Sequence, residues 1–176
     1  MRWQALFADL ELQLDAAQMQ ERLDEVPELT RAERAGVALL DRLRAHSGQV
    51  AVTVHGGECL RGSLMDVGPQ WALIADGPRE HLVPTWAIVL VTGLGDVAAP
   101  APGVVGSRLR LGHALRAVAR DRSVVRALTT AGAVVGRVDA VGTDHLDVAL
   151  VRPEDDRPTG ARCAVAWSAL LVLSRG

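Results

Sequence analysis

The sequence predicts a mostly β protein of the α+β class, built from two tandem small barrels that are each preceded by a helix. The main observation is an internal repeat. Apolar residues in segment 50–75 alternate and are interrupted by glycine turns, which is the pattern of three short strands. Segment 124–149 repeats this pattern without a gap, so that Val124 matches Val50. Two copies of one motif predict two copies of one fold.

The second observation is that glycines stand at equivalent points of the two copies. Gly62 matches Gly136, and Gly68 matches Gly142. A glycine inside a strand permits a sharp bend, and a glycine that closes a strand permits a turn with positive φ. Short strands that bend at such points curl, and this favours small barrels over flat sheets.

Residues 1–47 are predicted to form helices that precede the first barrel. An amphipathic helix at 1–26 has an apolar stripe at helical spacing and ends before Pro27. A capping box at 30–33 begins a second helix that runs to about His46. The stripe either packs on the protein's own barrels or forms a partner or dimer face. Its residues are Trp3, Leu6, Phe7, Leu10 and Leu14.

The first barrel is predicted at 48–95 and the second at 123–176. Their last strands agree, because segment 165–173 resembles segment 83–91 once a longer hairpin in the second copy is allowed for. This hairpin, at 152–160, is rich in charge and proline and is predicted to be a solvated loop.

A linker at 96–106, stiffened by two prolines, is expected to lead into a helix at 107–122. This helix carries the basic cluster of the chain, and its arginines continue into the strand that follows. They either form a solvated face that pairs with acidic residues or contact phosphates. The possible nucleic-acid-binding residues are Arg108, Arg110, Arg116, Arg120, Arg122 and Arg126.

No pattern indicates a catalytic centre, a metal site or a cofactor site, so the protein is predicted not to be an enzyme. A zinc site between the 55–59 hairpin and His81 is geometrically possible, but Cys59 alternates with core residues. Cys59 and Cys163 are interpreted as small buried hydrophobes in a reducing cytoplasm. No small-molecule substrate is evident.

Charge and hydropathy predict a cytoplasmic protein without a membrane partner. The net charge is −2, so no global field draws the chain to nucleic acid or to an anionic membrane. Acidic residues interrupt any apolar run after Met1, which argues against a signal peptide. The longest uncharged apolar stretch, 81–95, contains a proline and is too short to cross a bilayer.

The strand, turn and glycine pattern of both copies resembles the first motif of the Sm-like fold, a small SH3-like barrel preceded by a helix. The chain is also similar to uncharacterised actinobacterial proteins that begin with a tryptophan-containing helix. Sm-like proteins that bind RNA carry an acidic residue and then an asparagine before the third strand. Those positions fall near Gly68 and Ala72 in the first copy, and near Gly142 and Leu146 in the second. The resemblance therefore implies the fold without the residues that contact RNA.

Small open barrels leave strand edges with unpaired backbone groups, which must be paired or covered. The resemblance implies that edges pair between units. The leading hypothesis is therefore a non-catalytic assembly or protein-binding module that self-associates or adds a partner strand. The alternative is an RNA- or DNA-binding regulator that uses the arginine-rich helix at 108–126. The low net charge and the scarcity of aromatic residues count against this alternative.

Overall fold

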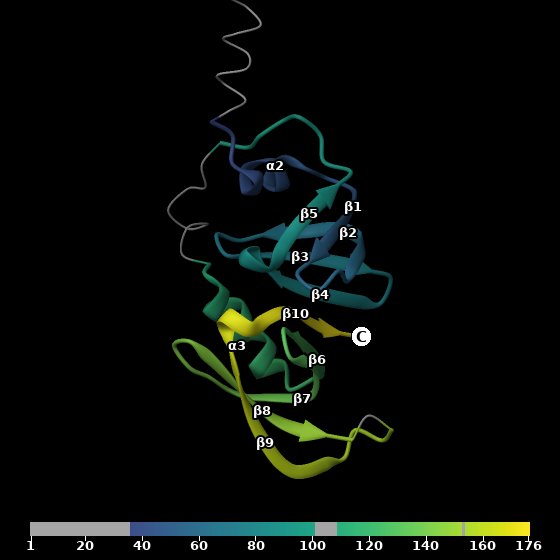
Figure 1. The fold of residues 1–176 in the computed structure, drawn as a ribbon, viewed down its shortest axis with the longest axis vertical. Coiled ribbons are helices and arrows are strands. Elements are labelled where there is room, and N and C mark those ends of the chain that lie inside the picture. Colours follow the sequence, from purple (N-terminus) through teal and green to yellow (C-terminus); the bar gives the residue numbers. More distant parts are fainter. Residues whose placement is uncertain (1–35, 101–108, 153) are drawn as a thin grey trace, which may run out of the picture. The chain divides into compact units, whose positions relative to one another are not determined.

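The computed structural model describes residues 36–100, 109–152 and 154–176 (Figure 1). The chain divides into two units, with a boundary between Ala38 and Leu39. Almost all of the described residues belong to the second unit, and every helix and strand given below lies in it. The helix predicted at 1–26 lies outside the described residues.

The first half of the second unit begins with a short helix and continues with five strands. Gly48, with a φ of 136°, follows the helix in a conformation that suits glycine and turns the chain into the first strand. The elements are α2 (Leu39–Ala45), β1 (Gln49–Val54), β2 (Cys59–Val67), β3 (Trp71–Asp76), β4 (Arg79–Pro84), a 3-10 turn (Thr85–Ala87) and β5 (Ile88–Thr92).

The second half has the same order of elements. Its helix ends at Arg122, whose φ of 57° places it in the left-handed region and reverses the chain. The elements are α3 (Leu111–Asp121), β6 (Val124–Thr129), β7 (Gly132–Val141), β8 (His145–Val151), β9 (Pro158–Ala166), a 3-10 turn (Trp167–Ala169) and β10 (Leu170–Arg175).

In the described residues, all strands belong to one antiparallel ten-stranded sheet with the order β5-β1-β2-β3-β4-β10-β6-β7-β8-β9 (Figure 1). The predicted mostly β class, with a helix before each set of strands, is therefore confirmed. The predicted division into two tandem small barrels is not confirmed, because the sheet is open and β4 of the first half pairs with β10 of the second. The two halves thus form one continuous sheet, in which β5 and β9 are the outer strands.

The glycine correspondence between the halves is confirmed. A Cβ atom at Gly62 would collide with the carbonyl oxygen of Ala75, and one at Gly136 would collide with that of Ala149. Both glycines therefore sit where two strands approach too closely for a side chain. Each strand also shifts register a few residues later, at a bulge before Asp66 in β2 and at the matching place in β7.

The prediction that the repeat runs without a gap is wrong in its first strand. Val50 lies opposite Gly62, whereas Val125, and not Val124, lies opposite Gly136. The turn after β1 spans 55–57 and the turn after β6 spans 130–131, so the first turn is one residue longer. The counterpart of Val50 is therefore Val125, and both are buried.

Several predicted boundaries also differ from the structure. Residues 36–38 and 109–110 are not helical, so α2 and α3 begin later than the helices expected from 30 and 107. The strand β9 begins at Pro158, inside the segment that was predicted to be a loop. Cys59 is exposed rather than buried, because its neighbour Leu60 is the residue that points to the core.

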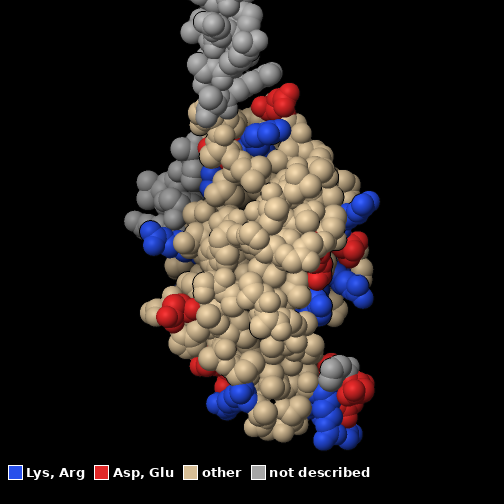
Figure 2. All heavy atoms as spheres, in the orientation of Figure 1, with Lys and Arg blue, Asp and Glu red and all other residues tan. Residues whose placement is uncertain are grey.

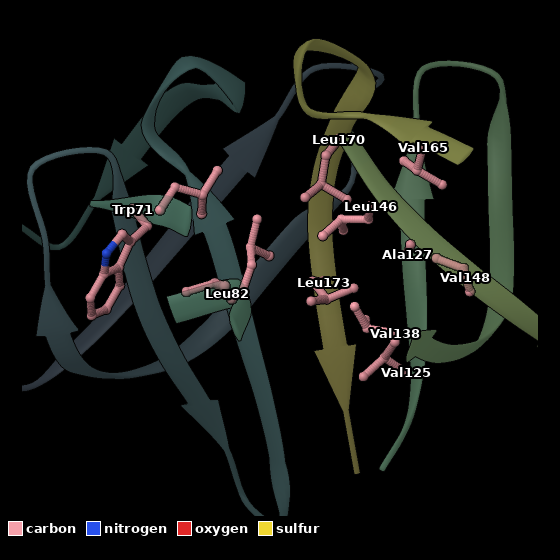
Figure 3. Close-up of a cluster of buried hydrophobic side chains, with 12 residues drawn as sticks. Trp71, Leu82, Val125, Ala127, Val138, Leu146, Val148, Val165, Leu170 and Leu173 are labelled. Atoms are coloured by element: carbon pink, nitrogen blue, oxygen red, sulfur yellow. The ribbon is translucent and has the colours of Figure 1, made fainter. Parts of the chain in front are cut away.

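Two clusters of buried side chains hold the unit together. One cluster consists mainly of residues from the second half, and it also contains Trp71 and Leu82 from β3 and β4. Figure 3 shows these two side chains on one side of β10 and residues of β6 to β9 on the other. The second cluster consists mainly of first-half residues, and it also contains Leu171 and Val172 from β10. Each half therefore contributes side chains to the core of the other.

Candidate functional site

The junction between the halves is the antiparallel pairing of β4 with β10. Leu82, His81 and Glu80 lie opposite Leu173, Ser174 and Arg175 in the ladder. The side chains at two of these pairs also interact. His81 Nδ1 lies 2.8 Å from Ser174 Oγ, and Arg175 Nε lies 2.7 Å from Glu80 Oε2. The ladder and these side-chain contacts fix the register of one half against the other.

Apolar residues of β10 are buried under the first half at this junction. Leu171 has 5% of its surface exposed and Val172 has none. Both pack in the cluster that contains Val83 of β4 and the buried residues of β1. Burial of a side chain of this size contributes about 1.5–3 kcal/mol, so the two residues are a main source of cohesion between the halves.

The strand β5 is as apolar as the matching part of β10, but it has no partner on its outer edge in the described residues. Equivalence of the halves places Val89 at the position of Leu171, and Leu90 at the position of Val172. Val89 is 58% exposed and Leu90 is 54% exposed. The strand therefore presents to solvent the surface that its counterpart buries. We name this surface, with the free edge of Ile88–Thr92, the β5 edge.

The other outer strand is β9, the counterpart of β4. Its pairing partner is β8 on one side, and its other edge is free in the described part of the chain. Cys163 of β9 corresponds to His81 and is partly buried. Burial raises the pKa of the Cys163 thiol, and the nearby Asp147 raises it further. Arg162 is paired with Asp139, with 3.2 Å between Nη1 and Oδ2.

The predicted arginines lie on more than one element, and two of them, Arg116 and Arg120, line the same groove. Arg116 and Arg120 are exposed on α3 and line a groove against the first half. Arg126 lies on β6, lines a different depression, and is 3.6 Å from Glu58 Oε1. Arg110 is the residue before α3, Arg122 is the residue after it, and Arg108 lies outside the described residues. Figure 2 shows charged side chains that are scattered over the face in view.

The histidines are separated as well. His81 is buried at the junction, while His145 is partly exposed and lies 2.8 Å from Asp144 Oδ1. The hydrogen bond with Asp144 raises the pKa of His145. Across the described ranges, no three side chains of the His, Cys, Asp or Glu type are grouped in a way that would hold a metal ion.

The predicted face of Trp3, Leu6, Phe7, Leu10 and Leu14 lies outside the described residues. Among the helices that the structure describes, none has the length and apolar character needed to cross a bilayer. Comparison of the chain with protein-family models, curated proteins and solved structures finds no match.

Sequence reasoning missed the β5 edge as a site, although a signal was present. Residues 88–91 are all apolar, without the alternation of a strand that has one face in water. The matching residues 170–173 are also all apolar. A continuous apolar strand predicts burial on both faces, but in β5 the side chains of Val89 and Leu90 are exposed.

Proposed function

We propose that the protein is a non-catalytic assembly module of two Sm-like units that joins further copies of itself through the β5 edge. The observation that carries this proposal is the contrast between equivalent residues. Val89 and Leu90 are exposed in β5, whereas Leu171 and Val172 are buried in β10. The strand β10 thus forms an interface within the chain, and its counterpart β5 is free in the described residues to form the same kind of interface with another copy.

The composition of the β5 edge supports this role. Soluble proteins protect free edges with charged residues, prolines or bulges that discourage pairing. The strand Ile88–Thr92 contains neither a charged residue nor a proline, and Val89 and Leu90 are exposed and apolar. Its register shift at Val89 is matched by one at Leu171 in β10, which pairs with β4 all the same. An apolar edge without charge or proline is typical of a strand that is paired in the functional state.

We propose β9 of a second copy as the partner. Because β10 pairs with β4 and β9 is the counterpart of β4, the internal junction supplies a template for the external one. Transfer of its register places Val91 opposite Ala164 and Thr92 opposite Cys163. The small residues of β9 leave room for the larger side chains of β5 at this contact.

This pairing joins two different surfaces and is therefore heterologous. Each copy would use its β5 edge to bind one neighbour and its β9 edge to bind another. Repetition of a heterologous contact produces a closed ring when the rotation between copies closes, and an open filament when it does not. Continued pairing would leave no free edge in a closed ring.

A cysteine cross-link tests the partner and the register together. The Thr92→Cys variant, in a Cys59→Ser background, places a thiol opposite Cys163 of the neighbouring copy. Directly opposite residues in an antiparallel pair have Cα atoms about 4.5–5.5 Å apart, within the range of about 4.4–6.8 Å that a disulfide spans. We expect disulfide-linked oligomers after oxidation at mildly alkaline pH, which offsets the raised pKa of Cys163.

Two controls make this cross-link specific. Removal of the partner thiol with Cys163→Ser should abolish the oligomers. Thr130→Cys moves the new thiol to an exposed threonine of the β6–β7 turn and should give none. Equal cross-linking from Thr92→Cys and Thr130→Cys would mean random collision and would contradict the proposed register.

A measurement of mass in solution tests the assembly itself. Light scattering of the full chain should give a mass above that of one copy, and Val89→Arg with Leu90→Arg should reduce it to one copy. Met65→Arg is the matched control, because Met65 is 61% exposed but lies on the β2 bulge away from both outer strands. A wild-type chain that stays monomeric at high concentration would refute the proposed function.

A further inference from the structure

A groove of about 620 Å³ lies between α3 and the strands β3, β4 and β10. Trp71, Leu73 and Leu82 of the first half form one wall. Ala114, Ala117 and Val118 of α3 form the opposite wall. This volume is within the range of about 300–1,000 Å³ that is typical of sites for small ligands, and the walls are apolar, as in most such sites.

One side of the helix α3 is buried in the core, and another side lines the groove. Leu111 and Leu115 are fully buried in the core of the second half, so they hold the helix in place. Trp71 Nε1 donates a hydrogen bond of 2.8 Å to the carbonyl oxygen of Leu109, which ties the start of the helix to the first half. Leu109 itself is 46% exposed and lines the groove. The groove is thus kept open by a helix that is fixed at its beginning and along its length.

The repeat provides an internal comparison for the groove. Strand pairing places His145 at the position of Trp71, Asp147 at that of Leu73 and Ala164 at that of Leu82. The first half is apolar at the three positions that form the wall, whereas the second half is polar or small there. The strand ladder is the same in both halves, so pairing alone does not require an apolar wall. Trp71 and Leu82 are only 7% and 6% exposed and belong to the core of the second half, so packing between the halves accounts for most of this difference. Leu73 is only partly buried and lines the groove, where an occupant can contact it.

Charged side chains at the margins of the groove indicate the chemistry of that occupant. Glu80 and Asp121 both line the groove, but both are held by Arg175, at 2.7 Å and 2.9 Å. Arg116 and Arg120 lie one helical turn apart on α3 and also line the groove, and Arg120 Nε donates a hydrogen bond of 3.2 Å to the carbonyl oxygen of Arg116. Neither of them forms an ion pair with any residue that the structure describes.

Asp66 is the remaining acid on the margin. Its Oδ1 accepts a hydrogen bond of 2.8 Å from the backbone nitrogen of Val67. His113 precedes Arg116 on the helix and adds a nitrogen donor to the same margin. The groove therefore combines apolar walls with three acids and three arginines, and the part of its margin that suits an anion is limited to Arg116 and Arg120.

We propose that this groove binds a single-chain amphiphile with an anionic head group, such as a medium-chain or long-chain carboxylate. The alkyl chain lies between Leu73, with the remaining exposed surface of Trp71 and Leu82, on one side and Ala117 on the other. The carboxylate accepts hydrogen bonds from Arg116 and Arg120, whose guanidinium groups suit a two-oxygen acceptor. This proposal is independent of assembly, because the groove is complete within one copy.

Titration calorimetry of the full chain with sodium dodecanoate, below its micelle concentration, tests the site. We expect saturable binding of one ligand per chain. The double variant Arg116→Gln with Arg120→Gln should weaken this binding at least about tenfold, because it removes the charge-assisted hydrogen bonds to the carboxylate. Arg110→Gln is the matched control, because Arg110 precedes the same helix but does not line the groove. It should leave the affinity unchanged.

Two further arms separate a specific site from general surfactant binding. Ala117→Met fills the groove and should abolish binding, whereas Ala131→Met, at an exposed alanine in the β6–β7 turn, should not. Dodecyltrimethylammonium has the same chain with a cationic head and should not bind. The proposal is overturned if the wild-type chain does not bind dodecanoate saturably, if the cationic ligand binds equally well, or if Arg110→Gln weakens binding as much as the double variant.

Discussion

His81 Nδ1 lies 2.8 Å from Ser174 Oγ, and this hydrogen bond joins the two halves of the sheet across the β4–β10 junction. His81 is also the one polar or charged residue that the structure describes as buried. Burial lowers the pKa of His81, because the charged imidazolium loses its hydration there. Asp76 and Glu58 act in the opposite direction without outweighing burial. The junction therefore contains a titratable group that is held in its neutral form.

This arrangement predicts a loss of stability at mildly acidic pH. A histidine whose folded pKa is below its unfolded value of about 6.5 binds its proton more readily when unfolded, so its contribution is present above pH 6.5. The contribution is lost as the pH falls below that value. We expect the free energy of unfolding to fall between pH 7.5 and pH 5.5, as measured by urea denaturation, and His81→Gln to reduce this slope.

His145 is the control for the pH experiment. Its pKa is raised by the hydrogen bond with Asp144, so its contribution has the opposite sign: it is present below about pH 6.5 and lost as the pH rises through the folded value. His145→Gln should therefore steepen the acid-side fall, not reduce it. Unchanged slopes in the His81→Gln variant would show that other groups cause any pH dependence.

The equivalent glycines of the two halves predict a matched pair of stability changes. Gly62→Ala and Gly136→Ala should each lower the free energy of unfolding by about 1–3 kcal/mol, because the added Cβ would meet a backbone carbonyl that cannot move aside. Gly95→Ala is the control, since a Cβ there meets no atom within 4 Å, and it should change stability by less than about 0.5 kcal/mol. A cost at only one of the first two positions would contradict their equivalence.

Much of the fold could be predicted because the repeat contains residue types, such as glycine and alternating apolar residues, that have strong preferences for particular backbone conformations. Gly62 and Gly136 mark a close approach of strands, which only glycine permits, and the alternation in β1 identifies the buried face. The one-residue difference between the two turns could not be found in this way. Val124 and Val125 are identical residues, so a shift by one position leaves the sequence match intact.

The candidate sites were predicted less well than the fold, because they depend on contacts between distant segments. Sequence reasoning gathered the arginines of 108–126 into one face, but Arg126 belongs to a strand and pairs with Glu58 of the first half. The groove wall of Trp71 and Leu82 is brought to α3 only by the β4–β10 pairing. No local pattern in the sequence encodes that pairing.

The contrast between β10 and β5 predicts different costs for truncation of equivalent residues. Leu171→Ala should destabilise the protein by about 2–4 kcal/mol, because Leu171 is buried between the halves and its loss leaves a cavity. Val89→Ala should change the free energy of unfolding by less than about 0.5 kcal/mol when measured on dilute protein, where copies are dissociated. A large cost for Val89→Ala under these conditions would mean that β5 is already covered within one copy.

The separation of the arginines predicts the outcome for nucleic acid, which is the alternative function. Arg116 and Arg120 can supply two phosphate contacts on α3, and the net charge of −2 adds no attraction over longer distances. Each phosphate contact on a single strand contributes about 0.7 to the slope of log affinity against log salt, so two arginines give a shallow dependence and weak binding. Titration with single-stranded RNA of mixed sequence at low salt should therefore give no saturable binding in the micromolar range. Micromolar binding with a steep salt slope, lost in the variant Arg116→Ala with Arg120→Ala, would favour the nucleic-acid function over assembly. Such binding would contradict this prediction, since a steep slope requires more basic residues than these two.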